Sequence, residues 1–398
     1  MKTTLRKMLG ITIATVIVVI AGAYCLAWLN LDRSGLARSI IWMDADSDDH
    51  LRFPSRTIEA GNTPFTLGYG PGYPEGLPST IVPGHPDLSS MLAGSETTAF
   101  IVIADGRLIY ERYFDGHDRH SIQTSFSVAK SFNSALIGAA VSQGLIGSID
   151  DPITDYIPEL LRRDERFGAI TIRHLLSMSS GLRYEPAGMP WGDDAKTYYD
   201  PDLRRLALEK SEIIGEPGQR FHYNNYNPLL IGIILERTTG MAVCDFLSET
   251  LWKPIGAVAD ASWSLDSDAN GFEKMESGIN ALPIDLVKLG MLYLDGGVWN
   301  GNQILPADWV DQSTRRSDAT DPSNGYQYGW WTFSDDTLGD YYAAAGNKGQ
   351  YMFVFPQDRL VVLRLGRSLG GVDWVRTIPA IAREMRPRAA RSDENSDG

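Results

Sequence analysis

A serine and a lysine three residues apart are the first candidates for chemistry in this 398-residue chain. Ser127 and Lys130 lie at the start of Val128 to Val141, a segment that is apolar on almost every side and therefore predicts a buried helix. Residues three apart share one face of a helix. A buried lysine is costly unless it is paired or loses its proton, and a neutral lysine beside a serine hydroxyl is a general base beside a nucleophile. The alternative is an exposed helix start, with the lysine stem over apolar surface and the amine in water.

A tyrosine and an asparagine form the second candidate group. Tyr223 and Asn225 follow the turn at Pro217-Gly218 and precede an apolar helix, a loop position that suits catalytic side chains. The Tyr223 hydroxyl, beside a cationic lysine, can relay the proton of Ser127 to a leaving group, and Asn225 would orient the lysine and the substrate carbonyl. The alternative is a helix cap with a packed aromatic ring.

A glycine-rich stretch, Ala344 to Gln350, is the third candidate. It leads into the apolar run Tyr351–Phe355, and glycines before an edge strand let a ligand approach the backbone closely. The N–H of Gln350, after Gly349, would then join the N–H of Ser127 in an oxyanion hole. A hairpin turn, which uses the same glycines, is the alternative.

Strands near both ends of the chain and helices between them must position these groups. Two β-rich runs, 99–104 and 107–114, meet at Asp105-Gly106, a dipeptide that tight hairpins favour. Four later runs also predict strands: 326–332, 341–345, 351–355 and 360–365. Helices are expected at 172–178, 203–210, 228–239, 281–294, 306–312 and 372–385. We therefore expect an α/β (α+β) fold in which both ends of the domain build one antiparallel sheet, helices flank it, and an all-helical subdomain is inserted at about 149–313.

The N-terminus predicts export. Basic residues precede Leu9 to Leu29, an uncharged and mainly apolar run long enough to span a membrane. We expect residues 1–30 to be an uncleaved anchor in a bacterial inner membrane, with the rest in the periplasm or otherwise outside the cytoplasm. Secretion after cleavage near Ala21-Gly22-Ala23 is the alternative. Residues 31–96 then read as a linker or a surface-hugging extension, 97–386 as the working domain and 387–398 as a disordered tail.

Composition excludes several classes of protein. A formal net charge of -14 argues against a nucleic-acid partner, which requires basic patches. Only two cysteines are present, Cys25 within the apolar run and Cys244, so the exported part has no internal disulfide and no Cys-x-x-Cys metal motif. We expect no metal and no cofactor, and the sequence leaves the oligomeric state open.

The order of the motifs resembles the serine β-lactamase and penicillin-recognising superfamily, from about Thr98 to Met385. Within it, the likeness is to the class C and esterase-type branch, and there to the 6-aminohexanoate-dimer hydrolase-like serine hydrolases. The supporting segments are Ser127 to Ser131, Ile149 to Pro152, Thr171 to Leu182, and Gly349-Gln350.

The resemblance implies a role for each candidate. Ser127 would be the nucleophile, Lys130 its general base and Tyr223 the partner acid or base, while Asn225 matches the asparagine of the family's Tyr-x-Asn motif. The backbone of Gln350 would take the oxyanion position. The implied reaction is acyl transfer in two steps, through an acyl-enzyme that water hydrolyses.

One departure from the family pattern bears on the substrate. The third motif usually begins with lysine or histidine, whereas this chain has the neutral Asn347, although Lys348 follows it. We therefore expect an esterase or amidase for small uncharged or zwitterionic substrates. A β-lactamase or D-Ala-D-Ala carboxypeptidase is the alternative, and a non-catalytic, membrane-anchored binding protein is a further one. Five aromatic residues are candidates for lining an acyl pocket or for a structural role: Trp191, Tyr198, Tyr199, Trp330 and Trp331.

Overall fold

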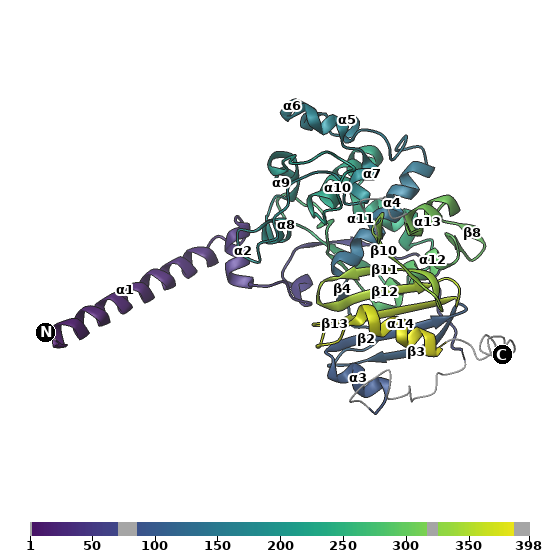
Figure 1. The fold of residues 1–398 in the computed structure, drawn as a ribbon, viewed down its shortest axis with the longest axis horizontal. Coiled ribbons are helices and arrows are strands. Elements are labelled where there is room, and N and C mark those ends of the chain that lie inside the picture. Colours follow the sequence, from purple (N-terminus) through teal and green to yellow (C-terminus); the bar gives the residue numbers. More distant parts are fainter. Residues whose placement is uncertain (1, 71–85, 317–324, 386–398) are drawn as a thin grey trace.

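The computed structural model of the protein describes residues 2–70, 86–316 and 325–385. A body of sheet and helices carries one long helix, α1 (Lys2–Trp28), which projects away from it (Figure 1). The tail expected at 387–398 lies outside the described residues, as does most of the Pro/Gly-rich part of the extension.

A seven-stranded antiparallel sheet forms the centre of the body. Its order is β3-β2-β13-β12-β11-β10-β9. The strands are β2 (Thr97–Ala104), β3 (Arg107–Tyr113), β9 (Tyr326–Gln327), β10 (Trp330–Asp335), β11 (Gly339–Gly346), β12 (Gln350–Phe355) and β13 (Leu360–Gly366). Because β2 pairs with β13, the two ends of the domain meet inside one sheet, and this prediction is confirmed.

The strand expected at 326–332 is in fact two strands. Tyr328 and Gly329 lie between β9 and β10 with φ of 37° and 87°, the left-handed region that turns a chain back on itself. The apolar character of the run continues through this turn, so hydrophobicity alone could not locate it.

Both faces of the sheet are buried, which explains why β2 is an unbroken apolar run. Phe100 and Val102 point into one core with Trp374, under α3 (Leu88–Gly94) and α14 (Trp374–Met385). Ile101 and Ile103 point into the other core, under α4 (Ala129–Ser142) and α12 (Pro283–Leu294). Alternate side chains of a strand face opposite sides, so each face buries every second residue.

The middle of the chain is mainly helical, as expected. Its helices are α5 (Ile153–Tyr156), α6 (Pro158–Arg163), α7 (Ile172–Leu176), α8 (Asp193–Tyr199), α9 (Leu203–Lys210), α10 (Tyr226–Thr239), α11 (Val243–Leu247) and α13 (Ala307–Thr314). Local signals set their ends: Asp202 accepts the Arg205 N–H where α9 begins, and Gly240 ends α10 at φ 68°. The block also contains short strands that the sequence did not predict, β5 (Ala261–Ser264), β6 (Ile279–Ala281), β7 (Val298–Trp299) and β8 (Asn302–Gln303).

The segment before the domain is not a bare linker. It contributes β1 (Ser55–Ile58) to a second sheet, of order β1-β5-β6-β4, in which β4 is Gln123–Thr124. It also forms α2 (Gly35–Trp42), whose Arg38 is 3% exposed and donates to the carbonyls of Tyr199 and Asp266. The described part of this segment therefore packs against the rest of the chain.

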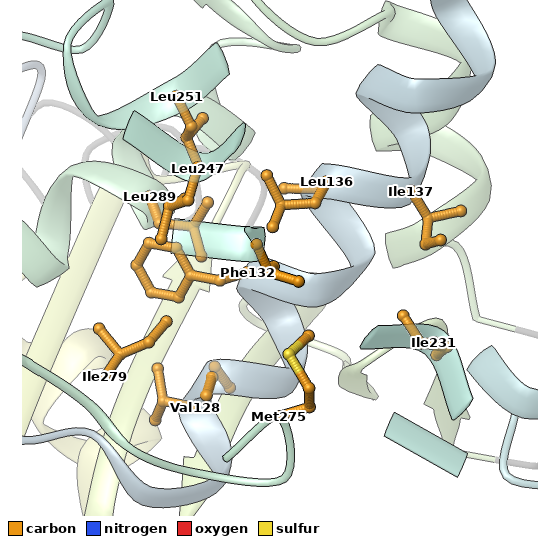
Figure 2. Packing of buried hydrophobic residues seen from close by; sticks show 14 of the residues in the cluster. Val128, Phe132, Leu136, Ile137, Ile231, Leu247, Leu251, Met275, Ile279 and Leu289 are labelled. Carbon is orange, nitrogen blue, oxygen red and sulfur yellow. The ribbon is translucent and has the colours of Figure 1, made fainter. Parts of the chain in front are cut away.

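Helix α4 runs through the larger core. Val128, Phe132 and Leu136 point into a cluster that α11, β6 and α12 complete, and Ile137 faces Ile231 of α10 (Figure 2). Twelve residues of the helix, Ala129 through Ala140, are buried. The position of α4, and of whatever its first turn carries, is thus fixed by packing on all sides.

We expect Phe132→Ala to destabilise the fold by about 3–5 kcal/mol, because it removes a fully buried aromatic ring and leaves a cavity. Thermal unfolding followed by circular dichroism should show a lower midpoint. Leu145→Ala, at an exposed position just beyond the end of α4, is the matched control and should leave the midpoint nearly unchanged. Equal midpoints for the two variants would contradict the packing role of α4.

Candidate active site

Ser127 and Lys130 lie side by side at the start of α4. Ser127 belongs to a 3-10 turn, η2 (Phe126–Val128), and Lys130 Nζ lies 3.0 Å from its Oγ. Phe126 has φ of 44°, so the chain turns sharply immediately before the serine. Such strained backbone persists only where its surroundings hold it, and it concentrates at functional sites.

The lysine head group is held by uncharged oxygens. Lys130 is 3% exposed, and its Nζ also donates to the carbonyl of Glu276, at 2.7 Å. Within the described residues no carboxylate forms an ion pair with it. The buried-helix prediction for Lys130 is therefore confirmed, and the exposed alternative is wrong. Sequence reasoning missed Glu276, since a backbone carbonyl leaves no mark in the sequence.

Tyr223 lies over the same lysine. The centre of its ring is 5.0 Å from Lys130 Nζ. The ring is stacked on Trp331 at 6.1 Å, and Tyr326 packs edge-on against it at 5.9 Å. Burial, with a smaller effect of charge on Tyr223, raises the pKa of Tyr326 well above its usual value, which keeps that neighbour neutral. Trp331 thus supports Tyr223 from behind.

Asn225 lines the same cavity as Ser127 and is held in place by Tyr184. Burial raises the pKa of Tyr184, and the hydrogen bond to Asp194 raises it further. Tyr184 therefore stays protonated and donates to Asp194 at 2.5 Å, so it must accept the 2.8 Å hydrogen bond from Asn225 Nδ2. The Asn225 Oδ1 atom is then left buried without a protein partner among the described residues. The predicted contact between Asn225 and Lys130 is not present; the carbonyl of Glu276 orients the lysine instead.

The glycine-rich stretch Ala344 to Gln350 approaches Ser127 through Gly346 and Asn347, three residues before the expected Gly349 and Gln350. A Cβ added to Gly346 would lie 3.0 Å from the Ser127 nitrogen and 2.6 Å from the Ser125 oxygen, so β11 ends directly against the backbone of Ser127. The next residue, Asn347, begins the 3-10 turn η5 (Asn347–Gly349), where the first N–H groups have no partner within the turn.

The oxyanion assignment to Gln350 is wrong. Its N–H donates to the carbonyl of Asn347. Its side chain is 2% exposed and bonds Gly366 through both Nε2, at 2.7 Å, and Oε1, at 3.0 Å. Gly349 lies behind it, with its carbonyl bound by Arg364. These residues hold the end of the sheet together, and the Asn347 N–H is the better candidate to join that of Ser127.

A cavity of about 770 Å³ brings the candidates together. Ser127, Tyr223, Asn225 and Asn347 line it, whereas Gly349 and Gln350 do not. The extension supplies part of the wall, which sequence reasoning missed: Ser39, Ile40, Met43, Asp44 and Ala45.

The five aromatic candidates divide between wall and support. Tyr198 and Tyr199 line the cavity. Trp191 lines a neighbouring hollow, Trp330 is fully buried in the core, and Trp331 stacks behind Tyr223. Their types alone could not separate these roles, because any buried aromatic ring satisfies the same pattern.

Comparison with known proteins identifies the family. Residues 90–384 match the beta-lactamase family, a span of well over half the chain. The chain belongs to the beta-lactamase family. The predicted superfamily and fold are thereby confirmed.

Several of the individual relatives are named as hydrolases. The 6-aminohexanoate-dimer hydrolase of Paenarthrobacter ureafaciens is 27% identical over 303 residues, which cover 70% of this chain and 75% of that protein. A Bacillus anthracis protein assigned as a 6-aminohexanoate-dimer hydrolase shares the fold at a TM-score of 0.75 and 22% identity, covering 92% of this chain and 98% of its own. A family VIII carboxylesterase shares the fold at a TM-score of 0.55 and 18% identity, and the match covers 72% of this chain and 92% of the esterase.

We expect Gly346→Ala to slow covalent labelling of Ser127 by a fluorophosphonate about a hundredfold, because the added methyl group displaces one of the two proposed oxyanion donors. The rate of adduct formation, followed by mass spectrometry, measures this. Gly68→Ala is the matched control, since a Cβ there meets nothing within 4 Å. Unchanged labelling in Gly346→Ala would contradict the oxyanion assignment.

Proposed function

We propose that this protein is a serine hydrolase that cleaves esters or amides of small substrates through an acyl-enzyme on Ser127. The observation that carries the proposal is the 3.0 Å contact between Ser127 Oγ and a buried lysine amine, in a cavity that Tyr223 also lines. A serine with a base in hydrogen-bond reach, itself oriented by a third group, is the arrangement of an activated nucleophile. The non-catalytic alternative leaves this buried polar arrangement without a purpose.

Acylation begins with the contact between Ser127 Oγ and Lys130 Nζ. Lys130 takes the Ser127 proton as Oγ bonds to the substrate carbonyl carbon, and the N–H groups of Ser127 and Asn347 stabilise the resulting oxyanion. The proton passes through Tyr223 to the leaving alcohol or amine as its bond to the carbonyl carbon breaks. The product is an acyl group on Ser127.

Deacylation reverses the roles with water as nucleophile. Water gives one proton to the Lys130 and Tyr223 pair as its oxygen bonds to the acyl carbon, and the proton returns to Ser127 Oγ as the acid departs. The two steps together convert an ester or amide and water into an acid and an alcohol or amine, and the enzyme returns to its starting state.

The charges around the cavity favour substrates that carry no carboxylate. Asn347 is neutral, and the neighbouring Lys348 forms an ion pair with Asp44 at 2.7 Å. Asp44, Asp194 and Glu276 line the same cavity, Glu276 being paired with buried Lys274, and the described lining residues include no lysine or arginine. An anionic β-lactam would meet acceptors and negative charge, which supports the esterase or amidase over the β-lactamase and the D-Ala-D-Ala carboxypeptidase.

We also propose that α1 anchors the enzyme in a membrane with the catalytic domain outside the cytoplasm. Ile11–Trp28 is long and apolar enough to span a bilayer, and only 6% of it is buried. The basic flank before it favours a cytoplasmic N-terminus. A signal segment cleaved after export remains the competing explanation of the same pattern.

Labelling with a fluorophosphonate tests the nucleophile. We expect one adduct per chain, on Ser127, which Ser127→Ala abolishes and Lys130→Ala slows by about a hundredfold or more. Ser142→Ala, at the far end of the same helix, should label normally. An unlabelled wild-type protein would refute the hydrolase proposal.

The substrate class is tested by paired assays. We expect kcat/KM for a p-nitrophenyl short-chain ester to exceed that for a chromogenic cephalosporin, because the described lining residues of the cavity include no lysine or arginine to bind the cephalosporin carboxylate, and the nearby Lys348 is paired with Asp44. Asn347→Lys should narrow the difference by adding that charge. A wild-type preference for the cephalosporin would instead identify a β-lactamase.

A further inference from the structure

An apolar rim borders the catalytic cavity on the side where α1 joins the body. It consists of Leu36, Ile40, Met43, Met189 and Trp191, which are between 43% and 74% exposed. Ile40, Met43 and Met189 line the catalytic cavity, and Leu36 and Trp191 line the adjoining hollow, with Pro190 common to both. Apolar side chains gathered at the mouth of a site, rather than scattered singly, indicate a contact surface.

The chain between α1 and this rim has little slack. Residues 29–34 separate the two helices, and Leu29 and Asn30 continue the last turn of α1 through bonds to the carbonyls of Cys25 and Ala27. Arg38 of α2 reaches back to the carbonyl of Leu31, at 2.8 Å. The end of the apolar helix is therefore held beside the first residue of the rim.

Helix α2 is also fixed to the catalytic domain. Ser39 donates to the carbonyl of Pro190, in the loop that carries Met189 and Trp191. Tyr199 donates to the carbonyl of Met43 at 3.0 Å, and Lys348 pairs with Asp44. With eight residues at 1.5 Å each, α2 spans about 12 Å. A bilayer that holds α1 thus lies within a short distance of the cavity mouth.

We propose that the apolar rim rests on the surface of the bilayer that holds α1, so that the cavity takes small amphiphilic esters dissolved in the membrane. The inference rests on the proposed hydrolase and its anchor. Trp191 suits this position, because tryptophan concentrates at membrane interfaces, and the remaining rim residues supply the apolar face of an interfacial contact. The chemistry is unchanged: Ser127 takes the acyl group, the alcohol leaves with a proton, and water releases the acid.

Membrane contact is measured on the full-length protein in phospholipid vesicles. A bimane label is placed at Leu36→Cys or Trp191→Cys in a Cys25→Ser background, since the only other cysteine, Cys244, is buried. Brominated phosphatidylcholine should quench both labels. Leu145→Cys, an exposed position beyond the far end of α4, is the matched control and should not be quenched.

A label on the native Cys25 tests the membrane anchor independently of the apolar rim. Labelled in the otherwise unchanged protein, it reports whether α1 is in the bilayer, because it lies exposed on that helix. Quenching at Cys25 without quenching at the rim overturns this inference and leaves the anchor intact. No quenching at Cys25 refutes the anchor and the inference together. A second copy of the protein would cover the rim if the rim labels are not quenched by brominated lipid but their emission shifts to shorter wavelength as protein density rises. That result also overturns the inference.

Activity gives an independent readout. In the same vesicles, Leu36→Glu with Trp191→Glu should lower hydrolysis of p-nitrophenyl laurate, which partitions into the bilayer, by about tenfold, because interfacial contact scales with apolar area. Hydrolysis of the water-soluble p-nitrophenyl acetate should change less than about twofold, since neither residue lines the catalytic cavity. Leu145→Glu should alter neither rate. An equal loss on both esters overturns the inference, whereas a wild-type protein inactive on the acetate refutes the hydrolase itself.

Discussion

The short path from Ser127 Oγ through Lys130 Nζ to the Glu276 carbonyl is the constraint on which the site depends. A lysine amine in this interior must be satisfied, and two uncharged oxygens do so without an opposing carboxylate. Helix α4 fixes one end of the path because the core packs around it on all sides. The segment before β6 fixes the other end. A shift in either element would leave a buried polar group unpaired, so the fold and the catalytic geometry are stabilised together.

The sheet reaches the same point from the opposite direction. Gly346 ends β11 against the Ser127 backbone, where a side chain of any size would collide with Ser125 and Ser127. Behind it, Gln350 and Arg364 join the ends of β12 and β13 through hydrogen bonds to backbone groups. The glycine permits the close approach of β11 to Ser127, and the buried polar residues hold the strand ends in that position.

The extension after α1 is tied to the wall of the cavity by buried polar groups. Asp49 accepts a hydrogen bond from Tyr198 at 2.9 Å, and Lys274 lies 4.0 Å from the same ring and pairs with Glu276 at 3.1 Å. Burial lowers the pKa of Lys274, because this part of the cavity wall is shielded from water. The wall therefore joins the segment after α1 to the residue that orients Lys130. A polar network of this kind makes residues that follow α1 part of the surroundings of Lys130.

The sequence by itself determined the family, the sheet built from both ends of the domain, and the pairing of Ser127 with Lys130. These follow from local rules, since helical spacing places the two residues on one face and an all-apolar segment must be buried. Only the tertiary structure decided that the Glu276 carbonyl binds the lysine, that Gly346 and Asn347 rather than Gln350 lie next to the serine, and that Met43 lines the cavity. Those contacts join segments far apart in the chain through backbone groups, which carry no residue-specific signal in the sequence.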